Sequence, residues 1–244
     1  MNFSRSLKAY AIILISCIIG QASLLALGAF LFYGSFELIH TGFGEAGKLA
    51  ADVFLSLLFP LQHSIMIRKK FRDRLVRFVR AEYHGILFTI ASGIVMLVIL
   101  GFWQQSAYTL FSLGGIFWWL LRGGYFLSIA GLSWGALSIV PFDPFGFYSI
   151  LYTLRGTTPP PLQLAIRGPY RYVRHPLYLL SIVMIWSCPE ITADRLVFNV
   201  LWTVWIIIGA RLEERDLIAT FGDAYRNYQQ KIPMLVPRSI RPVL

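Results

Sequence analysis

The sequence predicts an all-α integral membrane protein, a bundle of five to six transmembrane helices formed by a single domain over residues 1–244. Of the 244 residues, 57% are hydrophobic, and the mean hydropathy is +0.63. A soluble domain of this length has a more polar composition. The apolar residues also gather in long runs, as helices that cross a bilayer require.

The apolar runs define the candidate spans. Six runs lie at about residues 9–33, 50–67, 84–103, 116–140, 177–188 and 192–210. The first run follows Arg5 and Lys8 as a signal peptide would, but it is long enough to span, and we expect it to be retained. The run at 177–188 is shorter than the roughly 20 residues that a spanning helix needs. It is therefore either a tilted span paired with the next run or a re-entrant segment, and the number of spans stays at five or six.

The distribution of basic residues supports this layout. Six spans place 19 of the 22 lysines and arginines on one side, at the N-terminus, in segments 68–80 and 155–174, and after residue 210. The positive-inside rule then predicts a multi-pass protein of a bacterial-type inner membrane with both termini in the cytoplasm. The net charge of +10 is explained by this topology, so no nucleic-acid partner is expected. Segment 68–80 is expected to contact anionic lipid head groups.

Two polar clusters follow apolar runs on the predicted cytoplasmic side. Segment 167–178 combines arginines, a histidine and tyrosines, and segment 211–216 reads Arg-Leu-Glu-Glu-Arg-Asp. Charged groups at membrane depth are costly and usually mark a site. Because both clusters lie on one side, we expect them to form one polar pocket. Two interpretations remain open: a salt-bridge network that closes the bundle, or a site for a zwitterionic ligand.

Other polar residues are weaker candidates. His63 stands between Gln62 and Ser64 at the end of a span and is either a packing residue or a functional one. Asp143 either caps a turn or faces the pocket. No set of histidine, cysteine, aspartate and glutamate has the spacing of metal ligands, so no metal site is predicted.

The ordered motifs of the C-terminal third resemble those of a known superfamily. They read Arg174-His175-Pro176-x-Tyr178, Glu213-Glu214-x-x-Leu217 and Phe221-Gly222-x-x-Tyr225-x-x-Tyr228. This pattern is similar to that of the membrane methyltransferases related to isoprenylcysteine carboxyl methyltransferase and the phospholipid N-methyltransferases. Three further motifs resemble the bacterial thiol S-methyltransferase and NnrU-like branch, namely Leu61-Gln-His-Ser, Phe142-Asp-x-Phe-Gly146 and Pro233-Met-Leu-Val-Pro237. Where the family pattern often has glycine two residues after the tyrosine, this sequence has Leu180.

The resemblance implies a C-terminal core, residues 166–237, that binds S-adenosylmethionine in a cytoplasmic pocket. The residues that it implies for the cofactor are Arg174, His175, Pro176, Tyr178, Glu213 and Glu214, with Tyr170 and Tyr225 as possible walls. The expected activity is methylation of a small thiol, with His63, Asp143 and Tyr178 as catalytic candidates. Two alternatives stay open: an isoprenylcysteine-like or lipid acceptor, and a non-enzymatic membrane carrier or sensor.

Overall fold

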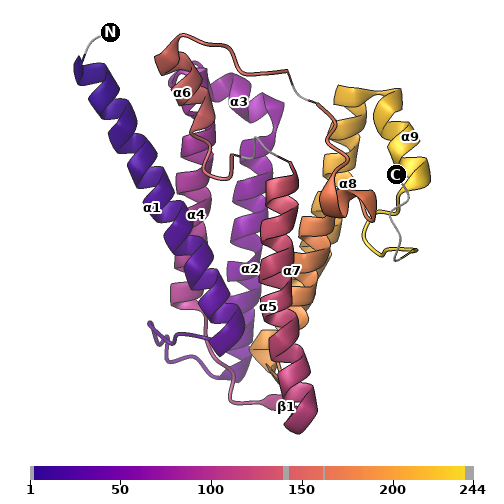
Figure 1. Cartoon of the computed structure of the whole chain (residues 1–244). Helices are drawn as coiled ribbons and strands as arrows, with labels where there is room; N and C mark the ends of the chain where they lie inside the picture. The colour runs from indigo at the N-terminus through magenta and orange to yellow at the C-terminus, as the bar shows by residue number, and fades with distance from the viewer. Residues whose placement is uncertain (1–2, 140–142, 162, 240–244) are drawn as a thin grey trace. The chain divides into compact units, whose positions relative to one another are not determined.

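The computed structural model describes residues 3–139, 143–161 and 163–239. Val140, where one predicted span ends, and Phe142 of the quoted motif lie outside these ranges. The described residues form helices and one small sheet, and the all-α prediction is confirmed in its main part (Figure 1). They divide into two compact units, which are residues 1–106 with 143–161, and residues 107–142 with 162–244.

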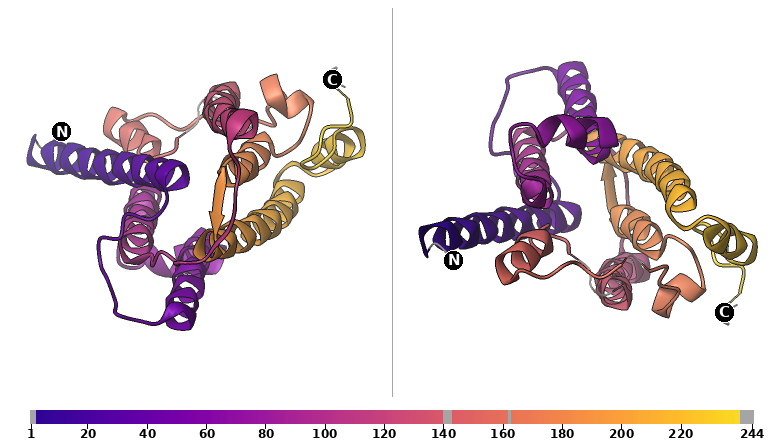
Figure 2. Two further views of the ribbon diagram at one scale, coloured as in Figure 1. Left: turned by 90° about the horizontal axis from the view of Figure 1, so that it is seen from below. Right: turned by 90° about the horizontal axis from the view of Figure 1, so that it is seen from above.

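The first unit is built around three long helices. They are α1 (Phe3–Tyr33), α2 (Glu45–Ile67) and α4 (His84–Phe102), with short helices α3 (Lys69–Leu75), η1 (Ala81–Tyr83) and α6 (Tyr148–Arg155). Helix α4 packs against both α1 and α2, and Figure 2 shows α1 and α4 side by side. A Cβ atom on Gly93 would lie 2.7 Å from Ile19 Cγ2, so the absence of a side chain at Gly93 allows this close approach.

The second unit contains the predicted core. Its elements are β1 (Thr109–Ser112), α5 (Gly115–Ser138), η2 (Gly168–Arg171), α7 (Pro176–Trp186), β2 (Glu190–Thr192), α8 (Ala193–Phe221) and α9 (Asp223–Lys231). Strands β1 and β2 pair antiparallel, with Thr109 opposite Thr192 and Ser112 opposite Glu190. This pairing joins the start of α5, the end of α7 and the start of α8. Helix α7 therefore returns toward the sheet, while α5 and α8 leave it.

Five of the described helices are long and apolar enough to cross a membrane: α1, α2, α4 with η1, α5 and α8. The predicted span at 177–188 corresponds to α7, which has 11 residues. At 1.5 Å per residue α7 is about 16 Å long, roughly half of the hydrocarbon thickness. The structure thus agrees with the interpretation of five full spans and one short apolar helix.

One helix extends well beyond its predicted apolar span. The span expected to end near residue 210 continues as α8 to Phe221 and carries the Arg-Leu-Glu-Glu-Arg-Asp segment on the same helix. Leucine, glutamate and arginine are good helix formers, so the change to polar residues does not end the helix. The helix ends at Gly222, whose φ of +55° suits glycine.

Candidate functional site

The second unit brings the two predicted polar clusters together. His175 directly precedes α7, and Pro176 occupies its first turn, where proline is favoured. The segment after α9 lies alongside, because Arg174 N–H donates to the Pro233 carbonyl at 2.9 Å and His175 N–H donates to the Met234 carbonyl at 3.1 Å. The start of α7 is thereby held to the end of the described chain. The last third of α8 supplies the carboxylates.

Glu214 is the centre of the polar cluster. Its Oε1 atom accepts from Arg174 Nε at 2.6 Å and lies 3.3 Å from His175 Nε2 and 3.5 Å from the Tyr225 hydroxyl. Its Oε2 atom accepts from Gln229 Nε2 at 3.1 Å. Only 13% of its side chain is exposed. Glu214 is therefore occupied by partners from the protein itself.

Arg174 is engaged as fully as Glu214. Its Nη1 atom donates to the Gln229 carbonyl at 3.0 Å and to the Ile232 carbonyl. One guanidinium thus links the segment before α7 to α8 and to the end of α9. We call this Arg174–Glu214 pair the clamp. The clamp is an ion pair of the kind that the salt-bridge interpretation of the two clusters expects.

Glu213 differs from Glu214 although it is the adjacent residue. Its side chain is 45% exposed, and its Oε2 atom accepts from the Tyr178 hydroxyl at 2.6 Å. The His175 and Tyr178 rings stack beside it, with centroids 5.3 Å apart and planes 11° from parallel. An accessible carboxylate next to two stacked rings is suited to receive an ammonium or another cation.

Three more tyrosines, Tyr170, Tyr225 and Tyr228, surround the cluster, and the last two donate hydrogen bonds within it. The Tyr228 hydroxyl donates to the Tyr170 carbonyl at 2.6 Å. Burial, aided by the Glu213 charge, raises the pKa of Tyr170 to about 12. Burial also raises the pKa of Tyr225 and Tyr228. These phenols stay protonated at neutral pH, so they act as donors rather than as bases.

The buried ring of His175 predicts a pH dependence of stability. Burial lowers its pKa below the ordinary 6.5, although the neighbouring Glu213 and Glu214 oppose this shift. The unfolded chain then binds more protons than the folded chain just below pH 6.5, so stability falls as the pH falls. We expect the melting temperature in detergent to decrease from pH 7.5 to 5.5, and to decrease less in His175→Asn. Parallel curves for the two proteins would contradict this assignment.

The structure places the predicted site residues in two groups. Tyr170, Arg174, His175, Pro176, Tyr178, Glu213, Glu214 and Tyr225 all belong to the second unit. His63 and Asp143 belong to the first. The Asp143 carboxylate accepts from Phe147 N–H at 3.1 Å and from Tyr148 N–H at 2.7 Å, so it fixes the start of α6, in agreement with the capping interpretation.

His63 lies among aromatic side chains of the first unit. Its ring stacks on Phe59, with centroids 5.2 Å apart, and contacts Phe88 at 4.8 Å. The sequence interpretation missed Gln229 and the Ile232 carbonyl as partners of the clamp. A backbone carbonyl leaves no signal in a sequence, and Gln229 stands outside the motifs.

Comparisons with known proteins address the family. The model of the phospholipid methyltransferase family matches residues 124–224. The methanethiol S-methyltransferase of Pseudomonas deceptionensis is 34% identical over 208 residues, which cover 82% of this chain and 77% of the relative. The chain belongs to this methyltransferase family. The family model covers Arg174, His175, Tyr178, Glu213 and Glu214 of the polar cluster and ends just before Tyr225.

Other relatives extend the family. The methanethiol S-methyltransferase of Mycobacterium tuberculosis is 29% identical, with 78% of each chain covered. The protein Nurim of Danio rerio is 24% identical, with 69% of this chain and 64% of the relative covered. No solved structure shows a significant match to the chain. The family and the five long apolar helices together establish a multi-pass membrane methyltransferase that uses a methyl donor.

Proposed function

We propose that the chain transfers a methyl group from S-adenosylmethionine to a small thiol at the cytoplasmic side of a bacterial-type inner membrane. The observation that carries this proposal is the different environment of two adjacent carboxylates. Glu214 is fixed by Arg174, and Glu213 stays accessible beside the stacked His175 and Tyr178 rings. The cytoplasmic side is supported by the alternation of basic segments along the chain.

The residues of the cluster fit such a donor. When bound, S-adenosylmethionine supplies a methyl group already activated on a sulfonium. Glu213 would bind its ammonium group, and the faces of Tyr178 and His175 would stabilise its cationic part. Tyr170 and Tyr225 would form the walls. Arg174 and Glu214 are hydrogen-bonded to each other. They would position the groups that contact the donor rather than contact it through the Nε and Oε1 atoms of that bond.

The thiol acceptor is supported by the relatives of the chain that are named methanethiol S-methyltransferases. In the transfer, the acceptor sulfur forms a bond to the methyl carbon while the sulfonium–methyl bond breaks, and the thiol proton leaves. The thiolate is the competent nucleophile. The sequence motif around His63 makes it the candidate base for this proton, while Asp143 makes structural contacts with the start of α6.

The binding experiment is calorimetry of the detergent-purified protein with S-adenosylmethionine. We expect saturable binding that weakens about 10- to 100-fold in Glu213→Gln, because hydrogen bonds to charged groups contribute roughly 1.5–3 kcal/mol. Asp216→Asn is the matched control, since Asp216 is an exposed acid on α8, one turn away. Formation of dimethyl sulfide from methanethiol then tests the acceptor.

Two results would overturn the proposal. A well-folded protein that shows no saturable binding excludes the donor. Binding without transfer to any thiol excludes the acceptor class, and transfer to an isoprenylcysteine analogue or a lipid would then establish the alternative. That alternative rests on the phospholipid methyltransferase family model, which matches residues 124–224 and so includes Glu213 and Glu214.

A further inference from the structure

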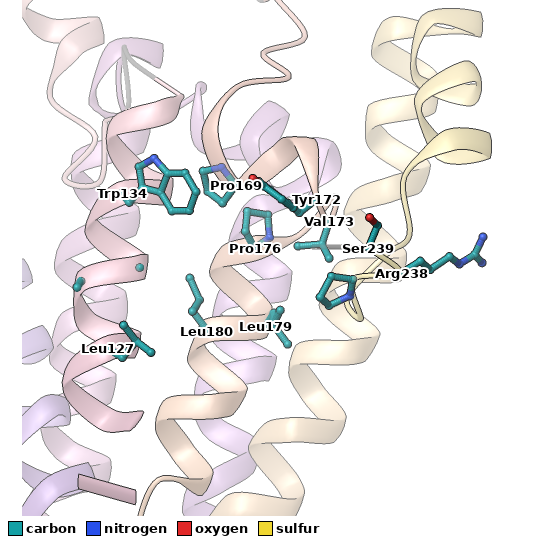
Figure 3. Close-up of a pocket in the computed structure, with 13 residues that line it drawn as sticks. Leu127, Trp134, Pro169, Tyr172, Val173, Pro176, Leu179, Leu180, Arg238 and Ser239 are labelled. Atoms are coloured by element: carbon teal, nitrogen blue, oxygen red, sulfur yellow. The ribbon is translucent and has the colours of Figure 1, made fainter. Parts of the chain in front are cut away.

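An apolar pocket of about 810 Å³ lies in the second unit between α5 and α7. Figure 3 shows its side chains, which come from these two helices, from η2 and the residues after it, and from the segment after α9. Most are apolar, including Leu127, Trp134, Val173, Leu179 and Leu180. Its size is in the range of pockets that hold small-molecule ligands.

The pocket shares a wall with the polar cluster. Tyr172 and Val173 line the pocket and directly precede Arg174, and Pro176 lines it and directly follows His175. On the other side, Pro237 to Ser239 line the pocket, only a few residues after the carbonyls that bind Arg174 and His175. One short segment therefore presents polar groups to the cluster and apolar groups to the pocket.

Leu127, Gly131 and Leu180 line the part of the pocket away from residues 172–176. The lining residues of α7 are Pro176, Leu179 and Leu180. Those of α5 are Leu127, Ala130, Gly131 and Trp134. A Cβ atom on Gly131 would lie 2.9 Å from Leu180 Cδ1 and 3.0 Å from Leu180 Cδ2. Helix α5 thus has no side chain at this point, and Leu180 fills the space between the helices.

We propose that this pocket receives the alkyl chain of the acceptor thiol and that Leu180 limits the length of that chain. The inference rests on the proposed function and identifies its substrate class as apolar alkyl thiols. The volume is far larger than a one-carbon thiol needs, so thiols with several carbons fit. The alkyl chain lies in the pocket beside residues 172–176, and Leu180, which lies against Gly131, narrows the space between α5 and α7.

The test measures kcat/KM for a series of straight-chain thiols from methanethiol to dodecanethiol. One methylene in a hydrophobic pocket changes the rate ratio by about tenfold or more. We expect the wild-type protein to accept several carbons and then show a sharp decrease. Leu180→Ala should move that decrease to longer chains and raise the ratio of long to short thiols by about tenfold.

Leu177→Ala is the matched control. Leu177 is also a partly buried leucine of α7 that packs on a glycine of α5, since a Cβ atom on Gly135 would lie 2.6 Å from its Cδ2 atom. It does not appear among the residues that line the pocket. Both variants lose similar packing, so a shift specific to Leu180 reports on the pocket rather than on helix stability.

A second measurement does not depend on catalysis. A thiol with a photoreactive alkyl chain should label residues of α5 between Leu127 and Trp134, and Leu180→Ala should increase that label for long probes. Wild-type transfer restricted to methanethiol, or equal length profiles for the Leu180 and Leu177 variants, would overturn this inference alone. Absence of transfer to every thiol would instead overturn the proposed function and, with it, the acceptor assignment.

Discussion

Replacement of Glu214 by alanine is expected to lower the free energy of unfolding by about 3–5 kcal/mol, the usual effect of breaking a buried ion pair. The Arg174 and Glu214 side chains are 11% and 13% exposed, so solvent screens them little. Without the carboxylate, the buried guanidinium keeps neutral partners such as the carbonyls of Gln229 and Ile232 but loses its counter-charge. Denaturant-induced unfolding of the detergent-purified protein measures the difference.

Glu213→Ala is the neighbouring control for this prediction. Its side chain is 45% exposed, and an exposed charge contributes about 0–1 kcal/mol. The double variant Arg174→Met with Glu214→Leu should recover part of the lost stability, since apolar replacement of a buried pair is often neutral. Equal destabilisation by Glu214→Ala and Glu213→Ala would show that the clamp does not hold the unit together.

Replacement of His63 by phenylalanine is expected to lower kcat/KM for a thiol by about 100-fold at pH 6–7, because general-base catalysis contributes 100-fold or more. Phenylalanine preserves the aromatic contacts with Phe59 and Phe88. The deficit should shrink toward pH 9, since the free thiolate fraction rises and a base is needed less.

The pH profile separates a base from a packing residue. A structural defect would lower the rate by the same factor at every pH, whereas loss of the base gives a factor that decreases as the pH rises. Binding of S-adenosylmethionine should be unchanged, because His63 belongs to the first unit and the donor is assigned to the second. Activity equal to the wild type from pH 6 to 9 would remove His63 from the mechanism.

The sequence predicted the helices better than their ends. Apolar runs identify the spans because a bilayer demands them, and α4 and α5 begin within one residue of the predicted positions. Helix α8 continues 11 residues beyond the apolar run that ends near residue 210, because hydropathy reports where a helix leaves the apolar layer, not where its backbone hydrogen bonds stop. The single-domain assignment of residues 1–244 and the cofactor core at 166–237 stay predictions.

For the site, the sequence motifs identified which residues lie close together but not which contacts each of them makes. Glu213 and Glu214 are identical in type and adjacent in sequence, and only the structure shows that one is held by Arg174 and the other is accessible. Helical rotation of about 100° per residue makes this difference. Which of the two glutamates is held and which is accessible cannot be assigned from the sequence, because the sequence does not show what each face of α8 contacts.

Helix α8 is long enough to cross a bilayer before it reaches Glu213. Glu213 stands 20 residues after Ala193, where α8 begins, which is about 30 Å along the helix axis. That distance equals the hydrocarbon thickness of a typical bilayer. In the proposed function, this length places the accessible Glu213 carboxylate near the water-facing boundary of the hydrocarbon layer. A water-soluble donor and a thiol dissolved in the lipid phase would meet there, and neither would have to cross into the other's solvent.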